Sequence, residues 1–319
     1  MHNDYVSTRQ PCSDEPELSA QTAINIMPRS KGRRRIWTAF VVPLLGLVLA
    51  LAFQAIIAGA AAAVLLSHGV DKSQLHPQIT DWLTSPGGGL ALFIGGQVGL
   101  VVPALFAAVR SSESWRTRLG LVPGRKLILV SLVVALASAL PMTVGLGLAE
   151  LAARTFPPDE GTLRFFGLLT PTSGFVFVVT TALLPGFFEE MLFRGYVQRR
   201  LLERWHPMWA IGVTTLMFSL VHGAPYQIVA VIPLGIWFGV VAWRTGTIVP
   251  TIISHAFVNG GLISWQLLAK FKAISDTTQS IANIFFFGIG ILSFVLGCRM
   301  LARLQEPIVR QVARRSVAV

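Results

Sequence analysis

The sequence predicts an all-α, polytopic membrane protein of about eight transmembrane helices. Of its 319 residues, 53% are hydrophobic and only 13% are charged, and the mean hydropathy is +0.64. Several apolar runs approach or exceed the roughly 18 to 20 residues that an α-helix needs to cross a bilayer. Basic residues gather between those runs. Together these observations indicate a chain that folds within a membrane.

Eight apolar runs define the expected spans. They cover residues 38–67, 88–109, 127–153, 174–193, 208–222, 227–243, 248–268 and 281–298. The first run follows a polar tail of more than thirty residues and is too long for the hydrophobic region of a signal peptide, so we expect an uncleaved anchor. Gly95 with Gly99, and Gly235 with Gly239, are spaced to let helices approach closely.

The placement of the basic residues predicts the orientation. The net charge is +11 and the pI is about 10.8. The 26 Lys and Arg residues fall on one side of the expected spans, except Lys72, Arg154, Arg164, Lys270 and Lys272. Because the basic side faces the cytoplasm, we expect a multi-pass protein of a bacterial cell membrane with both termini cytoplasmic. No segment combines basic and exposed aromatic residues as nucleic-acid binding requires.

The polar tail ahead of the first run has the composition of a disordered segment. Cys12 in this tail and Cys298 at the end of the last run would both face the cytoplasm. Disulfides are rare in that compartment. The sequence therefore predicts neither a disulfide nor a thiolate metal site.

Two adjacent glutamates, Glu189 and Glu190, lie at the end of the fourth run, and Arg194 follows four residues after the second. A carboxylate in hydrocarbon costs about 2.5 to 3.5 kcal/mol even on the lenient insertion scale, so intramembrane acids are candidates for a functional site. Residues four apart share a helical face, so Glu190 and Arg194 point the same way. Glu189 faces roughly 100° away, which suggests a different role.

Further polar residues lie in later runs. His222 ends the fifth run, and His255 and Asn259 share a face of the seventh. Taken singly, a buried histidine can simply satisfy a hydrogen bond, Asn259 can join two helices and Arg194 can snorkel. Taken together, two carboxylates, two imidazoles and a carboxamide could supply the base, the oxyanion donors and the acid of peptide hydrolysis.

These residues form three short motifs. In chain order they are EExxxR, FxxxH and HxxxN, formed by Glu189, Glu190 and Arg194, by Phe218 and His222, and by His255 and Asn259. Their order and separations resemble the CAAX prenyl protease and bacteriocin-processing (Abi, or CPBP) family of intramembrane endopeptidases. The resemblance covers about residues 174–260.

The resemblance implies an intramembrane cavity and a role for each motif residue. It makes Glu189 the base that activates water, assisted by His222, while His255 and Asn259 hold the oxyanion. The remaining motif residues would support the site: Glu190, Arg194 and Phe218. The implied organisation is a cytoplasmic tail at 1–35, N-terminal helices at 36–170, a catalytic core at 171–265, and a last helix with a basic cytoplasmic tail at 266–319.

A metal is the alternative to a glutamate-dependent mechanism. Glu189, His222 and His255 offer oxygen and nitrogen donors that could hold Zn²⁺ with an open position for water. The HExxH pairing of two histidines on one helical face is missing, and asparagine is a poor zinc ligand. We therefore favour the glutamate-dependent mechanism and keep Zn²⁺ as the alternative.

The depth of the residues sets a geometric condition. On straight helices Glu189 falls near the cytoplasmic end of its span and His222 toward the far end of the next. We expect the fourth span to extend further along the chain and the turn at 222–225 to stop inside the protein. A separation beyond about 10 Å between the Glu189 carboxylate and the His222 imidazole would contradict a shared site.

Two other function classes remain open. A non-catalytic relative, such as an immunity or scaffolding protein, would keep its phenotype when the motif residues are replaced. A proton- or cation-coupled transporter also buries carboxylates and histidines, but it typically carries broken helices in paired repeats, which we do not find. The substrate is open as well: a prenylated CAAX-type terminus, a leader peptide with a double-glycine site and a regulatory membrane protein would each fit.

Overall fold

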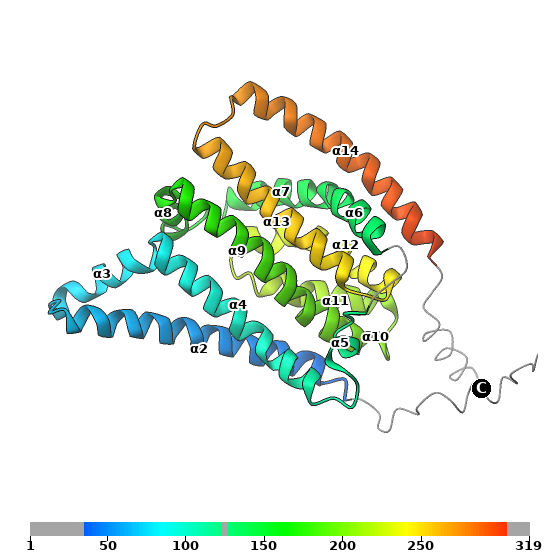
Figure 1. Ribbon diagram of the computed structural model, residues 1–319, viewed down its shortest axis with the longest axis horizontal. Coiled ribbons are helices and arrows are strands. Elements are labelled where there is room, and N and C mark those ends of the chain that lie inside the picture. Colours follow the sequence, from blue (N-terminus) through cyan, green and yellow to red (C-terminus); the bar gives the residue numbers. More distant parts are fainter. Residues whose placement is uncertain (1–34, 123–126, 305–319) are drawn as a thin grey trace, which may run out of the picture. The chain divides into compact units, whose positions relative to one another are not determined.

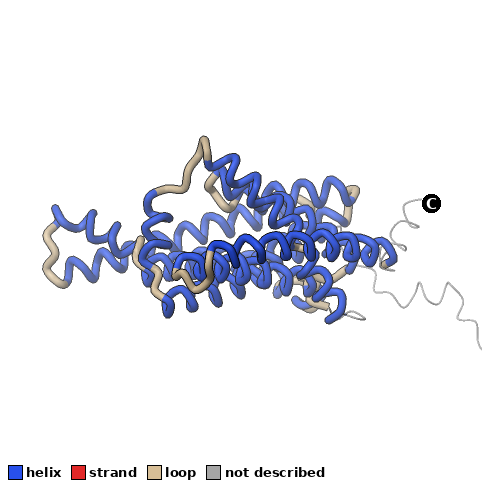
Figure 2. Tube along the Cα trace, turned by 90° about the horizontal axis from the view of Figure 1, so that it is seen from above, coloured by secondary structure: helices blue, strands red, loops and turns tan. Residues whose placement is uncertain are grey.

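The protein is helical throughout the part that the computed structural model describes, residues 35–122 and 127–304 (Figures 1 and 2). Within these residues, seven helices are long and apolar enough to cross a membrane. The all-α, multi-pass prediction is therefore confirmed. Residues 1–34 of the predicted tail, Cys12 among them, and the basic tail after residue 304 lie outside the described residues.

The first two long helices form an antiparallel pair. α2 (Thr38–Ser67) and α4 (Pro86–Val109) pack side by side, with the short α3 (Lys72–Leu83) between them in the chain (Figure 1). Glycine permits this approach, because a Cβ added to Gly99 would lie 2.5 Å from the backbone nitrogen of Ala50. One of the predicted glycine pairs thus lies at a close helix contact.

The third predicted span is divided into two helices. α6 (Leu127–Ala137) and α7 (Ala139–Ala153) meet at Ser138. Pro141 has no N–H to donate to the carbonyl of Ala137 four residues earlier, which accounts for the break. The two helices still form one apolar run of 27 residues.

The fifth predicted span is too short to cross a bilayer. It is α11 (Pro207–Leu220), whose 14 residues rise about 21 Å and fall short of a hydrocarbon core of about 30 Å. The described residues thus contain seven helices long enough to span and this shorter apolar one, which agrees with the expected total of about eight. Gly223, with a φ of 76°, turns the chain directly into α12 (Pro225–Thr245).

The fourth predicted span is longer than its apolar run. α9 (Pro171–Glu189) continues into a π-helix, η1 (Glu190–Gln198), and then into α10 (Arg199–Leu202). The combined run of 32 residues is one candidate span. Glu189 therefore lies in the interior of the span rather than at its end, and the expected extension along the chain is present.

The π-helix lies at the centre of the packing. It contacts α2, α4, α11 and α12, and all of its nine residues are buried. α13 (Val249–Lys270) runs along α9, and α14 (Asp276–Arg303) lies against α6 and α7 (Figure 1). The glutamates of the fourth span are thus enclosed by helices from both halves of the chain.

Candidate active site

The site begins where α9 changes from α-helix to π-helix. This change falls between Glu189 and Glu190. In a π-helix the backbone bonds span five residues, and such turns occur frequently at functional sites. Both adjacent carboxylates approach His255 of α13, although an ideal α-helix would direct them about 100° apart. The two carboxylates therefore meet at opposite nitrogens of one imidazole.

Glu190 forms a buried ion pair with Arg194. Arg194 Nη1 donates to Glu190 Oε1 at 2.9 Å, and neither side chain is exposed. The guanidinium carbon lies 4.2 Å from the ring centre of Phe218, and Nη2 donates to the carbonyl of Gly235 at 3.3 Å. The pairing expected from the i,i+4 spacing is therefore present, and the charge of Glu190 is balanced within the protein.

A second polar contact follows one turn later. Gln198, which the sequence analysis did not single out, donates to the carbonyl of Gly239 at 2.8 Å. Arg194 and Gln198 therefore face Gly235 and Gly239 as two parallel pairs. The signal that could have identified Gln198 is its position four residues after Arg194, opposite a glycine pair with the same spacing.

His255 lies between the two glutamates. Its Nδ1 is 3.0 Å from Glu190 Oε1, and its Nε2 is 3.9 Å from Glu189 Oε2. An ionised carboxylate can only accept a hydrogen bond. Nδ1 of His255 therefore carries a proton and donates a hydrogen bond to Glu190. The ring of Phe238 lies 5.5 Å from the imidazole centre. Glu190 therefore orients the imidazole, and Nε2 is directed toward Glu189.

Glu189 has a different environment from its neighbour. Its side chain is buried, and Oε1 accepts a hydrogen bond from Gln97 Nε2 at 2.8 Å. Oε2 has no hydrogen-bond partner among the described residues. Gln97, on α4, was also missed by the sequence analysis, although a lone carboxamide in an apolar run between Gly95 and Gly99 could have drawn attention to it.

His222 lies beside this group rather than within it. Its Nδ1 is 2.9 Å from the carbonyl oxygen of Phe218, so Nδ1 is the protonated nitrogen and Nε2 keeps its lone pair. The ring of Phe218 contacts both imidazoles, with centres 5.0 Å from His222 and 6.1 Å from His255. Within the described part of the chain, no hydrogen bond or ion pair joins His222 to Glu189. Their shared site stays a prediction.

Asn259 is engaged by the backbone of α9. Pro185 has no N–H for the carbonyl of Thr181 four residues earlier, and Asn259 Nδ2 donates to that carbonyl at 3.2 Å. One amide proton of Asn259 thus completes a hydrogen bond that proline removes from the helix. The other amide proton is not used by this contact.

The structure therefore joins most of the predicted residues into one buried group. We call it the glutamate cluster, and it consists of Gln97, Glu189, Glu190, Arg194 and His255. The ring of Phe218 packs on the cluster and contacts the His222 imidazole, whereas Asn259 contacts α9 at the carbonyl of Thr181.

Residues 171–261 match the family model described as type II CAAX prenyl endopeptidase, Rce1-like. We call residues 171–261 the Rce1-like segment, after the family model to which they are similar. The match confirms the resemblance predicted from the three motifs, and it contains all of them. No curated protein and no solved structure matches the chain. The Rce1-like segment runs from α9 into α13, so Gln97 on α4 lies outside it.

The predicted zinc ligands of the Rce1-like segment do not gather into a metal site. Among the described residues, no group of three or more His, Cys, Asp or Glu side chains is placed to hold a metal ion. Glu189 and His255 approach each other, but Glu190 Oε1 is occupied by Arg194 and His255, and among the described residues no hydrogen bond or ion pair joins His222 to any of them. The donor set therefore does not fit Zn²⁺.

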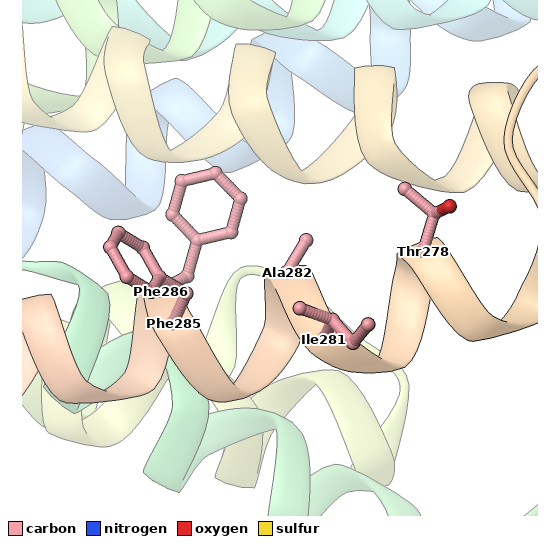
Figure 3. A pocket seen from close by; sticks show the side chains of 5 residues that line it. All are labelled: Thr278, Ile281, Ala282, Phe285 and Phe286. Carbon is pink, nitrogen blue, oxygen red and sulfur yellow. The ribbon is translucent and has the colours of Figure 1, made fainter.

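A hollow of about 300 Å³ lies elsewhere, along the first half of α14 (Figure 3). Its lining is apolar apart from one hydroxyl, and consists of Thr278, Ile281, Ala282, Phe285 and Phe286. None of the motif residues of the Rce1-like segment lines it. The active-site cavity implied by the resemblance therefore stays a prediction.

Proposed function

We propose that the protein is an endopeptidase that works within the membrane on membrane-associated or lipidated, CAAX-like substrates, using a water activated by Glu189. The match to a CAAX prenyl endopeptidase family supports the class of reaction. The observation that carries the proposal is the glutamate cluster, in which a buried histidine lies between two carboxylates. The two carboxylates have different partners, and we therefore assign them different roles.

Glu189 is the base in this proposal. A general base needs a lone pair within hydrogen-bond reach of the proton that it takes. Glu189 Oε2 has no protein donor in the described part of the chain, as is also true of Glu190 Oε2, and Glu189 Oε1 is held by the neutral amide of Gln97. Among the described residues, no Lys or Arg forms an ion pair with Glu189 as Arg194 does with Glu190, and His255 Nε2, charged only when protonated, lies 3.9 Å from Glu189 Oε2. Its carboxylate is therefore the one available for a proton.

The other motif residues serve the steps that follow. Attack of water on the peptide carbonyl forms a C–O bond, and the water proton passes to Glu189. His255, when Nε2 also carries a proton, and the second amide proton of Asn259 stabilise the oxyanion. Cleavage of the C–N bond then returns the proton to the leaving amine. His222, with its lone pair at Nε2, assists in directing the water.

The membrane arrangement belongs to the same proposal. The distribution of the basic residues supports a cytoplasmic location of both termini, and in this proposal residues 171–265 are the catalytic core between the N-terminal helices and the last helix. The Rce1-like match at 171–261 supports these limits for the core. The motif residues are thus carried by helices that pack inside the bundle, where water is scarce and electrostatic contacts are strong.

The test is cleavage of a prenylated CAAX peptide by the full-length protein in proteoliposomes. We expect Glu189→Gln to lower kcat by about 100- to 10,000-fold, the usual contribution of a general base. Glu150→Gln is the matched control, because Glu150 is a glutamate of the third span that is exposed and lies outside the glutamate cluster. Cleavage at the wild-type rate by Glu189→Gln would overturn the proposal.

The peptide series also tests the substrate class. The same peptide without its lipid, and a double-glycine leader peptide, are assayed beside the prenylated one. A preference for the prenylated peptide supports a CAAX-like substrate. Equal cleavage of all three peptides would contradict that part of the proposal while leaving Glu189 as the base.

A further inference from the structure

We infer that Gln97 is a positioning residue for Glu189, so that a helix outside the Rce1-like segment completes the active site. This inference rests on the proposed function. Gln97 Nε2 donates to Glu189 Oε1 at 2.8 Å across 92 residues of sequence. Both side chains are buried, with 8% and 6% of their surface exposed. A hydrogen bond to an ionised carboxylate in such a place is short and strong.

The hydrogen bond from Gln97 determines which oxygen of Glu189 is available to accept the proton of the water. The terminal torsion of a glutamate is broad, so packing alone does not fix the plane of the carboxylate. Gln97 holds Oε1, and this leaves Oε2 on the side of His255 Nε2, 3.9 Å away. Loss of the Gln97 donor frees the carboxylate to rotate away from the reacting water.

The direction of the Gln97 amide supports this role. Its nitrogen faces Glu189, because the reverse orientation would bring two acceptor oxygens together. Its own oxygen is buried and has no hydrogen-bond partner among the described residues. A carboxamide placed only to join two helices normally satisfies both of its ends. The contact with Glu189 is therefore the one that explains this residue.

Close packing of α4 holds Gln97 in place. Gly99 lies against the backbone of α2, and a Cβ on Gly95 would lie 2.5 Å from Ile57 Cδ1. α4 also packs on α9 and on η1. The glycines on either side of Gln97 thus fix the helix that carries the donor, and the N-terminal helices contribute directly to the active site.

The experiment compares Gln97→Met with Gln54→Met in the proteoliposome assay with the prenylated peptide. Methionine has nearly the same length as glutamine but cannot donate. Gln54 is the matched control, because it is partly buried on the neighbouring helix and its amide donates to a backbone carbonyl, that of Leu92. We expect Gln97→Met to lower kcat by about 10- to 100-fold with little change in KM, as loss of orientation does. Gln54→Met keeps the wild-type kcat.

A second variant and a stability measurement separate positioning from folding. Gln97→Glu places an acceptor where Gln97 donates, and we expect it to lower kcat at least as far as Gln97→Met. The melting temperatures of Gln97→Met and Gln54→Met should be similar. The inference is overturned if Gln97→Met keeps the wild-type kcat, or if its kcat falls only in proportion to a loss of folded protein. If the wild type cleaves no peptide, the proposed function fails first.

Discussion

The two adjacent glutamates lie side by side where α9 passes into η1, but their surroundings differ. Glu190 is completely enclosed, and one of its oxygens accepts from both Arg194 and His255. Glu189 accepts from a neutral carboxamide, Gln97, and each of the two glutamates keeps one oxygen without a protein donor among the described residues. The difference teaches that the position of a carboxylate in the sequence does not decide its role. Its partners do.

The charge balance explains why the two roles do not exchange. Arg194 cancels the charge of Glu190 at 2.9 Å, and the guanidinium is held in turn by the ring of Phe218 and the carbonyl of Gly235. No Lys or Arg in the described part of the chain forms an ion pair with Glu189. A buried carboxylate without a cation is a costly state, and intramembrane charges of this kind are typical of functional sites.

The largest expected effect on stability comes from removing the ion pair between Glu190 and Arg194. Glu190→Gln leaves Arg194 as an unpaired buried charge, which we expect to lower the free energy of unfolding by about 3 to 5 kcal/mol. The measurement is thermal unfolding of the purified protein in detergent. Adding Arg194→Met removes the orphan charge and should restore part of the loss. An unchanged melting temperature in Glu190→Gln would contradict the structural role of the pair.

A smaller effect is expected from Asn259. It tests whether the hydrogen bond from Asn259 to α9 stabilises the fold. Asn259→Ala leaves the carbonyl of Thr181 unsatisfied, and we expect a loss of about 1 to 3 kcal/mol. Pro185→Ala restores a backbone N–H for the same carbonyl, so Asn259→Ala should be less destabilising in that background. The measurement is a double-mutant cycle of unfolding free energies. Strict additivity would contradict the inference that Asn259 replaces the hydrogen bond that Pro185 removes.

The smallest effect contrasts the buried acids with an exposed one. Asp159 accepts hydrogen bonds from the hydroxyl and the backbone N–H of Thr162, and these lower its pKa from the usual 3.8. Because the folded-state pKa is depressed, the stabilisation is present above the unfolded pKa and is lost as the pH falls through the folded pKa.

The matching experiment follows the melting temperature between pH 5 and 2 for the wild type and Asp159→Asn. The wild type should lose up to about 2 °C more than the variant as the pH falls, because the variant has no charge to lose. A larger loss in the variant would contradict the assignment.

Much of the fold was predictable because each long helix corresponds to an apolar run in the sequence. The first span was predicted to the residue, and the limits of α12, α13 and α14 lie within a few residues of their runs. The fourth span was cut short at Phe193 because Arg194, Gln198 and Arg199 interrupt its hydropathy. Periodicity could not show that packing buries these polar groups. The division of the third span at Ser138 had a local signal, Pro141, which hydropathy does not register.

Among the residues of the candidate site, only those that belong to one of the three motifs could be predicted from the sequence. Glu189, Glu190, Arg194 and His255 come together as the family motifs require of a common site. Gln97 and Gln198 have no motif, since their roles arise from helices that meet only after folding. The contact of Gln97 with Glu189, 92 residues away in the sequence, arises from the packing of the helices. The tautomers of the two histidines likewise follow from contacts that spacing does not contain.

The most direct test of the account measures turnover and stability together for Glu189→Gln and Glu190→Gln. The account predicts that Glu189→Gln loses at least about 100-fold in kcat while unfolding at the wild-type temperature or above it, because no cation is left unpaired. It predicts that Glu190→Gln unfolds at a clearly lower temperature. A Glu189→Gln protein that turns over normally, or that is destabilised as much as Glu190→Gln, would contradict the division of roles between the two glutamates.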